Sequence, residues 1–207
     1  MAISPGIAST VHASYAAWQP EASGRPALWT YKGDVYKGVR ANHLTRGDAD
    51  WAQQHIVIAS GLYGLVRPFD GIQSYRLEMK SALKIGRSDN LYTFWGEKLA
   101  EYVDARGSDW VCNLSSEEYA KPVTKYVHTN VVTPVFFDTK PSGAVGTVPI
   151  YSKMMRGVMA RWMIDQRLQT PEQLKLFSAH GYRYDAQRSK KDFPAFSRVT
   201  MVPLIFT

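Results

Sequence analysis

The residues best suited to chemistry lie in one short segment, residues 60–79. Within twenty residues it combines hydroxyl, guanidinium and carboxylate groups with three glycines and one proline. Glycine lets the backbone turn sharply and approach a ligand closely because it has no Cβ, and such loops often carry function. We therefore expect a ligand site here. Its candidate residues are Ser60, Tyr63, Arg67, Asp70, Tyr75, Arg76 and Glu78. The alternative is a structural connection in which Arg67 pairs with Asp70.

The positive charge of the chain is concentrated in its last quarter. Residues 152–207 hold 10 Lys and Arg against 4 Asp and Glu, whereas residues 1–151 hold 15 against 14. Segregated positive charge attracts phosphates and is typical of proteins that bind nucleic acids or nucleotides. The charge therefore predicts DNA or a nucleotide as partner. The alternative is a basic surface that has no polyanionic partner.

A helix predicted over residues 152–168 carries part of this charge. At 100° per residue its methionines and Trp162 fall on one side, which predicts a core-facing surface. Lys153, Arg156 and Arg161 fall on the opposite side, where they face either phosphates or solvent. Gly157 leaves space beside Arg156, which favours a ligand there.

Further polar groups lie outside segment 60–79. Lys32 follows an expected strand and is a candidate phosphate contact, unless it pairs with Asp34 in a structural turn. If the loops that carry them converge, the residues that could perform acid–base catalysis are Asp34, Tyr63, Glu78 and Glu118. The alternative is that these carboxylates form structural salt bridges. Residues 59–65 also admit a helix-hairpin-helix, whose backbone N–H groups contact DNA phosphates.

Several classes of protein are disfavoured. No run of 18 apolar residues occurs, so no membrane span is expected. The N-terminus lacks a basic segment followed by an apolar one, so we expect no secretory signal. A single cysteine suits the reducing cytoplasm. The scattered histidines show no ligand spacing, so neither a metal nor a cofactor is expected.

The order of expected elements indicates an α+β protein with one domain over residues 1–207, in which helices flank a mixed β-sheet. The expected helices are 8–17, 48–59, 90–105, 152–168 and a short one from Pro171; the expected strands are 27–31, 109–114, 130–138, 145–150, 181–184 and 196–202. Pro134 predicts an edge or bulge in the third of these strands.

Five sequence blocks, in the same order, resemble the YaaA family of bacterial proteins linked to peroxide stress. The blocks are KGDVYKG at 32–38, SGLYGLVRPFDGIQSYRLEM at 60–79, LYTFWG at 91–96, NLSSEEY at 113–119, and Lys153 with Arg156-Gly157. The resemblance implies an α+β fold of the YaaA type, DNA binding, and a role in limiting free iron and oxidative DNA damage. The residues themselves give iron handling no support.

Two departures from the family pattern are visible. Of its opening ISPAKT block the chain has ISP at 3–5, and Lys32 follows after 31 residues, so we expect a shortened N-terminal region. Met154-Met155 stand where a lysine and an alanine are usual.

Together these observations predict a cytoplasmic DNA- or nucleic-acid-binding protein that contacts phosphates through a basic cleft. The cleft would be built from Lys32, Ser60, Arg67, Arg76, Lys153, Arg156 and Arg161. An enzyme that acts on a nucleobase, nucleoside or nucleotide in the same cleft is the main alternative, and a module that binds an acidic protein is a third. Whether the protein is an enzyme stays open.

Overall fold

The computed structural model describes residues 5–19, 22, 24–199 and 203–204. The α-helices are α1 (Pro5–Ala16), α2 (Ala27–Thr30), α3 (Asp34–Val39), α4 (Arg46–His55), α5 (Leu91–Trp95), α6 (Lys98–Asp104), α7 (Glu117–Thr124) and α8 (Pro149–Gln166), with 3₁₀ turns η1 (Ala41–His43) and η2 (Pro171–Leu176). The strands are β1 (Arg25–Pro26), β2 (Ile58–Ser60), β3 (Gly64–Val66), β4 (Gly71–Ile72), β5 (Trp110–Cys112), β6 (Asn130–Val132), β7 (Val135–Thr139), β8 (Val145–Gly146), β9 (Ser178–Ala179), β10 (Tyr182–Tyr184) and β11 (Ala195–Arg198).

The largest sheet has five strands in the order β8-β7-β11-β10-β9. Strands β7 and β11 are parallel, whereas the other neighbours are antiparallel, so the sheet is mixed. Three two-stranded sheets, β1-β4, β2-β3 and β5-β6, complete the strand pairing of the described residues. The predicted class, α+β with a mixed sheet flanked by helices, is confirmed.

Pro134 lies between β6 and β7, so the strand expected at 130–138 is divided there into two strands, whereas an edge or bulge was predicted. The residues on either side of Pro134 still form backbone hydrogen bonds with the chain just before β11. Thr133 N donates to Asp192 O at 2.8 Å, and Val135 N donates to Pro194 O at 2.9 Å. Gly143 supplies the left-handed backbone, with φ of +80°, in the turn that leads from β7 to β8.

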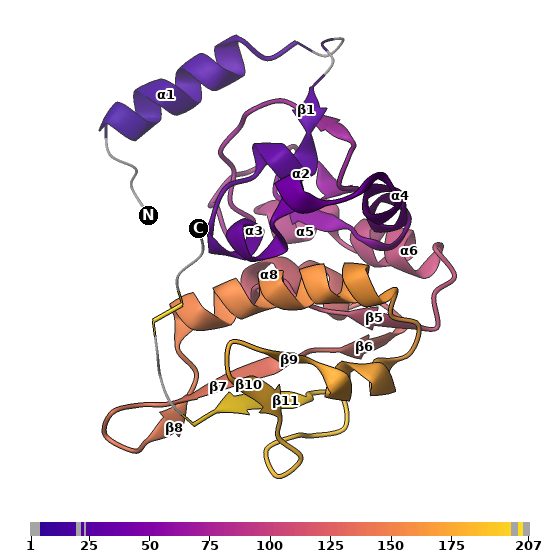
Figure 1. Ribbon diagram of the computed structural model, residues 1–207. Helices are drawn as coiled ribbons and strands as arrows, with labels where there is room; N and C mark the ends of the chain where they lie inside the picture. The colour runs from indigo at the N-terminus through magenta and orange to yellow at the C-terminus, as the bar shows by residue number, and fades with distance from the viewer. Residues whose placement is uncertain (1–4, 20–21, 23, 200–202, 205–207) are drawn as a thin grey trace.

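Helix α8 lies between two halves of the molecule (Figure 1). On one side Met155 and Met159 are fully buried in a core that the five-stranded sheet supplies with aromatic rings. The rings from its strands are Phe136, Tyr182 and Phe196, and Phe177 adds a fourth ring from the position just before β9. On another side Ala160 packs against the core of the N-terminal elements. The predicted burial of the methionine face is confirmed.

Helix α3 packs directly against α8. A Cβ on Gly157 would lie 1.8 Å from the carbonyl oxygen of Val35, and one on Gly38 would lie 2.5 Å from that of Met154. The two glycines therefore allow the helix backbones to touch. The expectation that Gly157 leaves space for a ligand is wrong, because α3 fills that space.

The expected strand at 27–31 is also wrong, because residues 27–30 form helix α2. Ala27 N donates to Asp70 O and Leu28 N to Pro68 O, both at 2.9 Å, while Tyr31 N closes the helical turn on Ala27 O. A short apolar run fits a strand and a buried helix equally well, so periodicity alone could not separate them.

Two other expected helices have different bounds in the structure. The helix expected at 90–105 is divided into α5 and α6 at Gly96, whose φ is +49°. Helix α4 ends at His55, and residues 58–60 pair antiparallel with β3. The glycine turn after Ser60 therefore joins two strands, and the helix-hairpin-helix interpretation is wrong. Within the described ranges, no helix combines the length and apolar character that a bilayer crossing requires.

Candidate functional site

Segment 60–79 begins with a β-hairpin whose turn is organised by a buried serine. Ser60 is 1% exposed, and its Oγ accepts hydrogen bonds from the backbone N of Leu62 at 3.2 Å and of Tyr63 at 2.9 Å. Gly61 packs so closely on the returning chain that a Cβ there would lie 2.4 Å from the Leu77 carbonyl oxygen. This close contact holds the hairpin against the chain that carries Tyr75.

Four tyrosines surround Ser60, and with it they form what we call the tyrosine cluster. Ser60 Oγ lies 2.5 Å from Tyr75 Oη, which lies 2.8 Å from Tyr31 Oη. Tyr31 and Tyr36 stack with ring centroids 5.6 Å apart. Tyr63 and Tyr75 meet edge to face at 5.4 Å. Three segments distant in sequence therefore converge here, and they bring Ser60, Tyr63 and Tyr75 together with Tyr31 and Tyr36.

Three phenols of the cluster, those of Tyr31, Tyr36 and Tyr75, are neutral near pH 7. Burial raises the pKa of Tyr36 and Tyr75 far above the ordinary value of 10.0. Burial also raises the pKa of Tyr31, although hydrogen bonds to Ser60 and Tyr75 oppose that rise. These hydroxyls can therefore donate and accept hydrogen bonds, but they do not supply negative charge.

Two of the predicted carboxylates meet at a lysine that the sequence analysis overlooked. Lys80 Nζ lies 3.3 Å from Glu118 Oε2 and 3.7 Å from Glu78 Oε2. The hydrogen bond to Glu118 is the main cause that raises the pKa of Lys80. Burial, and then the Glu118 carboxylate, raises the pKa of Tyr119 to about 12. Asp34 is elsewhere, at the start of α3, where it pairs with Lys37 at 3.2 Å.

The predicted cations of the N-terminal half have protein partners. Arg67 Nε lies 3.1 Å from Asp70 Oδ1, so the pairing considered as the alternative is present. Arg76 lies 3.8 Å from the carboxylate of Glu78. Lys32 Nζ donates to Trp29 O at 3.1 Å rather than to Asp34, so that alternative is wrong. All three cations are exposed, and exposed ion pairs such as those of Arg67 and Arg76 exchange readily with solvent or ligands.

The three predicted cations on α8 differ in their contacts and in their burial. Arg161 donates to Asp165 at 2.8 Å and to the carbonyl oxygens of Arg40 and His43, which fixes α8 to the chain after α3. Lys153 is exposed. Arg156 is half-buried, and burial lowers the pKa of its guanidinium. Among the described residues Arg156 has neither a carboxylate partner nor a hydrogen-bond acceptor.

Arg156 lies one turn before Ala160 on α8. Ala160 packs against the apolar core of the N-terminal elements, and Tyr31, Tyr36 and Tyr63 pack against the same core. Residues four apart lie one above the other on a helix. The candidate site thus combines hydroxyl and aromatic groups with a desolvated cation. No three His, Cys, Asp or Glu side chains gather closely enough for a metal in the part of the chain that the structure describes.

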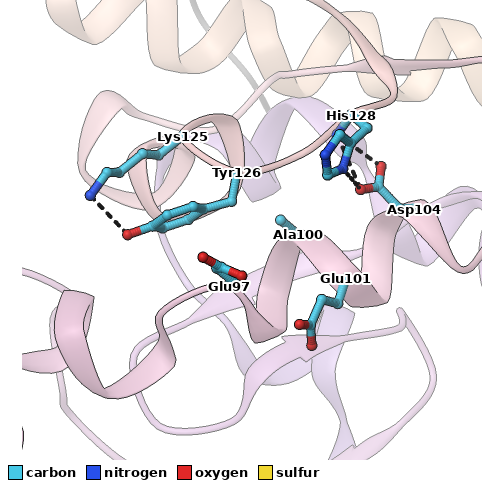
Figure 2. A pocket seen from close by; sticks show the side chains of 7 residues that line it. All are labelled: Glu97, Ala100, Glu101, Asp104, Lys125, Tyr126 and His128. Carbon is cyan, nitrogen blue, oxygen red and sulfur yellow. Dashed lines mark hydrogen bonds and ion pairs between the residues drawn. The ribbon is translucent and has the colours of Figure 1, made fainter.

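A surface hollow lies elsewhere, between α6 and the chain that joins α7 to β6 (Figure 2). Its lining residues are Glu97, Ala100, Glu101, Asp104, Lys125, Tyr126 and His128, and none is a predicted site residue. Asp104 has a structural role, because its Oδ1 accepts hydrogen bonds from Thr129 N at 3.0 Å and from Thr129 Oγ1 at 2.7 Å. These bonds hold the start of β6 at the end of α6.

The hydrogen bonds to Asp104 predict an acid-sensitive contribution to stability. The bonds to Thr129 are the main cause that lowers the pKa of Asp104 below 3.8 in the folded protein. A lowered folded pKa means that the stabilisation is complete above the unfolded value and is lost as pH falls through the folded pKa. We expect Asp104→Asn to lower Tm at pH 7 by about 2–4 °C. Thermal melts from pH 7 down to pH 2.5 measure this.

The Tm difference between Asp104→Asn and wild type should shrink as pH falls below about 4, because the unfolded wild type then binds a proton that the folded protein does not. Asp109→Asn, which changes an exposed carboxylate, is the matched control and should follow the wild type at every pH. A difference that is the same at every pH would contradict the assigned role of Asp104.

Comparison with known proteins agrees with these observations. Residues 1–188 match the family model described as peroxide stress protein YaaA. A UPF0246 protein of Marinomonas sp. (strain MWYL1) is 42% identical over 96% of this chain and 78% of its own length. UPF0246 proteins of Bordetella petrii and Paracidovorax citrulli are 41% and 42% identical over 96% of this chain and 80% and 79% of their own. The chain therefore belongs to the peroxide stress protein YaaA family.

Proposed function

We propose that this protein binds DNA or another nucleic acid through its phosphates, acts in the cytoplasm, and uses Arg156 as the central contact. The observation that carries the proposal is the half-buried Arg156 guanidinium, which lacks a protein acceptor among the described residues. A guanidinium stays charged at neutral pH. Burial of an unpaired charge costs free energy, so in natural proteins a buried charged group is paired with an opposite charge or a hydrogen-bonding group. An anionic ligand supplies the missing partner.

Phosphate is the anion that best fits the surroundings of Arg156. The planar guanidinium matches two phosphate oxygens, and arginine is preferred over lysine where such bidentate contacts form. Lys153 lies on the same helix and is exposed, and Lys32, Arg67 and Arg76 lie on exposed loops. Arg161 holds α8 in place rather than facing a ligand. The tyrosine cluster adds aromatic rings on which unstacked bases pack.

The test is binding of a labelled mixed-sequence oligonucleotide, single- and double-stranded, across a salt series. We expect affinity to fall steeply with salt, with a slope of about −0.9 per neutralised phosphate for duplex DNA and about −0.7 for single strands. Free nucleotides at equal phosphate concentration should displace the labelled oligonucleotide poorly, because each nucleotide offers few phosphates. Absence of binding at low salt, or binding that salt leaves unchanged, would overturn the proposal.

One observation favours an enzyme that acts on a nucleobase, nucleoside or nucleotide. Glu78 and Glu118 both contact Lys80, and Tyr119 lies close enough to Glu118 for its pKa to be raised by that carboxylate. Paired carboxylates beside a lysine and a phenol are a set suited to proton transfer.

Glu118→Gln separates the two functions. The substitution removes a negative charge, so DNA affinity should stay unchanged or rise up to about threefold. General acid–base catalysis by this carboxylate should fall by about 100-fold or more. Binding assays and product analysis with nucleosides and nucleotides measure the two effects. A marked loss of DNA affinity in Glu118→Gln would contradict the view that this carboxylate lies outside the phosphate contacts.

A further inference from the structure

Two large aromatic side chains that precede β1 are exposed. Tyr15, in the last turn of α1, is 40% exposed, and Trp18, just after that helix, is 38% exposed. The backbone N of Trp18 donates to Tyr15 O at 3.2 Å, so a single turn of the chain carries both rings. Single exposed apolar residues are common on protein surfaces, whereas rings that gather at one place indicate a binding surface.

Hydrogen bonds at the edge of each ring hold these side chains against segment 60–79. Tyr15 Oη donates to the backbone oxygen of Arg76 at 3.2 Å, and Trp18 Nε1 donates to Tyr63 Oη at 3.3 Å. Both bonds are made by polar atoms at the rim of the ring, so they fix its position without using its faces. The two rings therefore lie beside two of the predicted site residues, Tyr63 and Arg76.

Burial in a core does not account for the two rings. Helix α1 lies on the outside of the molecule (Figure 1), and none of its described side chains is buried. In the described part of the chain, neither Tyr15 nor Trp18 belongs to a buried apolar cluster. Instead, Gln19 N donates to Gln73 Oε1 at 3.0 Å and Gln73 Nε2 donates back to Gln19 O at 2.5 Å. The chain after Trp18 is thus bound to the same segment by polar contacts.

We propose that Tyr15 and Trp18 form an aromatic platform on which unpaired bases of the bound nucleic acid stack. The assignment rests on the proposed function and extends it from phosphates to bases. Proteins that bind single strands combine cations that contact the backbone with aromatic rings on which bases stack. Arg67 and Arg76 are exposed on the segment to which both rings are bonded, so the two kinds of contact occur together here.

Alanine substitutions test the aromatic platform. We expect Trp18→Ala and Tyr15→Ala each to lower affinity for a mixed-sequence single-stranded oligonucleotide about tenfold at constant salt. The salt slope should stay unchanged, because no phosphate contact is lost. Duplex affinity should change by less than about twofold, because paired bases have no free face on which to stack. Tyr102→Ala is the matched control, since Tyr102 on α6 is also 40% exposed, and it should leave both affinities unchanged.

Trp18→Phe separates stacking from the hydrogen bond to Tyr63. Phenylalanine keeps an aromatic ring and lacks the N–H, so single-strand affinity should stay within about threefold of the wild-type value. A loss as large as that of Trp18→Ala would overturn the platform, because the residue would then act through Tyr63. Tighter binding by Trp18→Ala would also overturn it, since the ring would then cover the site instead of contacting the ligand.

A strand of the same length that consists of abasic sugar-phosphate units tests for contact with bases. Wild type and Trp18→Ala should bind this strand equally, and a penalty that persists on it would overturn the platform. If wild type binds neither the natural single strand nor the duplex at low salt, the proposed function fails and the platform with it. If wild type binds the natural strand and both alanine variants bind it equally well, the platform alone fails.

Discussion

Replacement of Gly157 by alanine should destabilise the protein by about 3 kcal/mol or more. The new Cβ would lie 1.8 Å from the Val35 carbonyl oxygen and 3.0 Å from the Gly38 Cα. Backbone atoms cannot rotate away as a side chain can, so α3 and α8 must separate. For a domain of this size the loss corresponds to a fall in Tm of about 6–12 °C. Thermal melting followed by circular dichroism measures it.

Gly38→Ala probes the same contact from the other helix and should also destabilise, since its Cβ would meet Met154 O at 2.5 Å. Gly47→Ala is the matched control within helix α4. Its nearest neighbour would be an Arg167 side-chain nitrogen at 3.8 Å, an ordinary contact. Alanine there should be neutral or stabilising by up to about 1 kcal/mol. A Gly157→Ala protein that melts with the wild type would contradict the close packing of α3 on α8.

Arg156→Gln should weaken nucleic-acid binding by about 2 kcal/mol, roughly thirtyfold, while leaving the fold intact. The weakening follows because the guanidinium supplies a charge-assisted contact to phosphate. Stability should stay the same or rise, because the half-buried charge has no acceptor among the described residues to lose. Titration of labelled DNA and thermal melting measure both effects.

Two arginines provide controls for this substitution. Arg183 is exposed on β10 and follows the inward-facing Tyr182, so Arg183→Gln should change affinity by less than about twofold. Arg161→Gln breaks the bonds to Asp165 and to the chain after α3, so it should lower Tm. A fall in Tm for Arg156→Gln as large as that for Arg161→Gln would contradict the ligand-facing role that we propose for Arg156.

Segment 60–79 could be identified from the sequence, since glycine turns beside hydroxyl and charged groups are visible there. Its convergence with Tyr31 and Tyr36 could not, because nothing local indicates that α2 and α3 fold back on it. Hydrogen bonds from Ala27 and Leu28 to the backbone of residues 68–70 bring them there. Such contacts depend on the whole fold, and short apolar segments do not reveal them.

The excess of positive charge in residues 152–207 is visible in the sequence, but which of these cations form ion pairs is not. Four of the ten cations form ion pairs in the structure, namely Arg161, Arg167, Arg188 and Arg198. The pairs of Arg161 with Asp165 and of Arg188 with Asp185 are readable from spacings of four and three. The partners of Arg167 and Arg198 are distant in sequence. Arg156 has no carboxylate three or four residues away, which was the available signal of the different role that we propose for it.

The most direct measurement is the dependence of binding on salt for wild type and Arg156→Gln with the same duplex oligonucleotide. We predict two linear plots of log Kobs against log salt, with the variant weaker throughout and its slope smaller in magnitude by about 0.9. A difference of that size corresponds to one phosphate that the variant no longer neutralises. Identical affinities and slopes for the two proteins would contradict a phosphate contact at Arg156 and with it the proposed function.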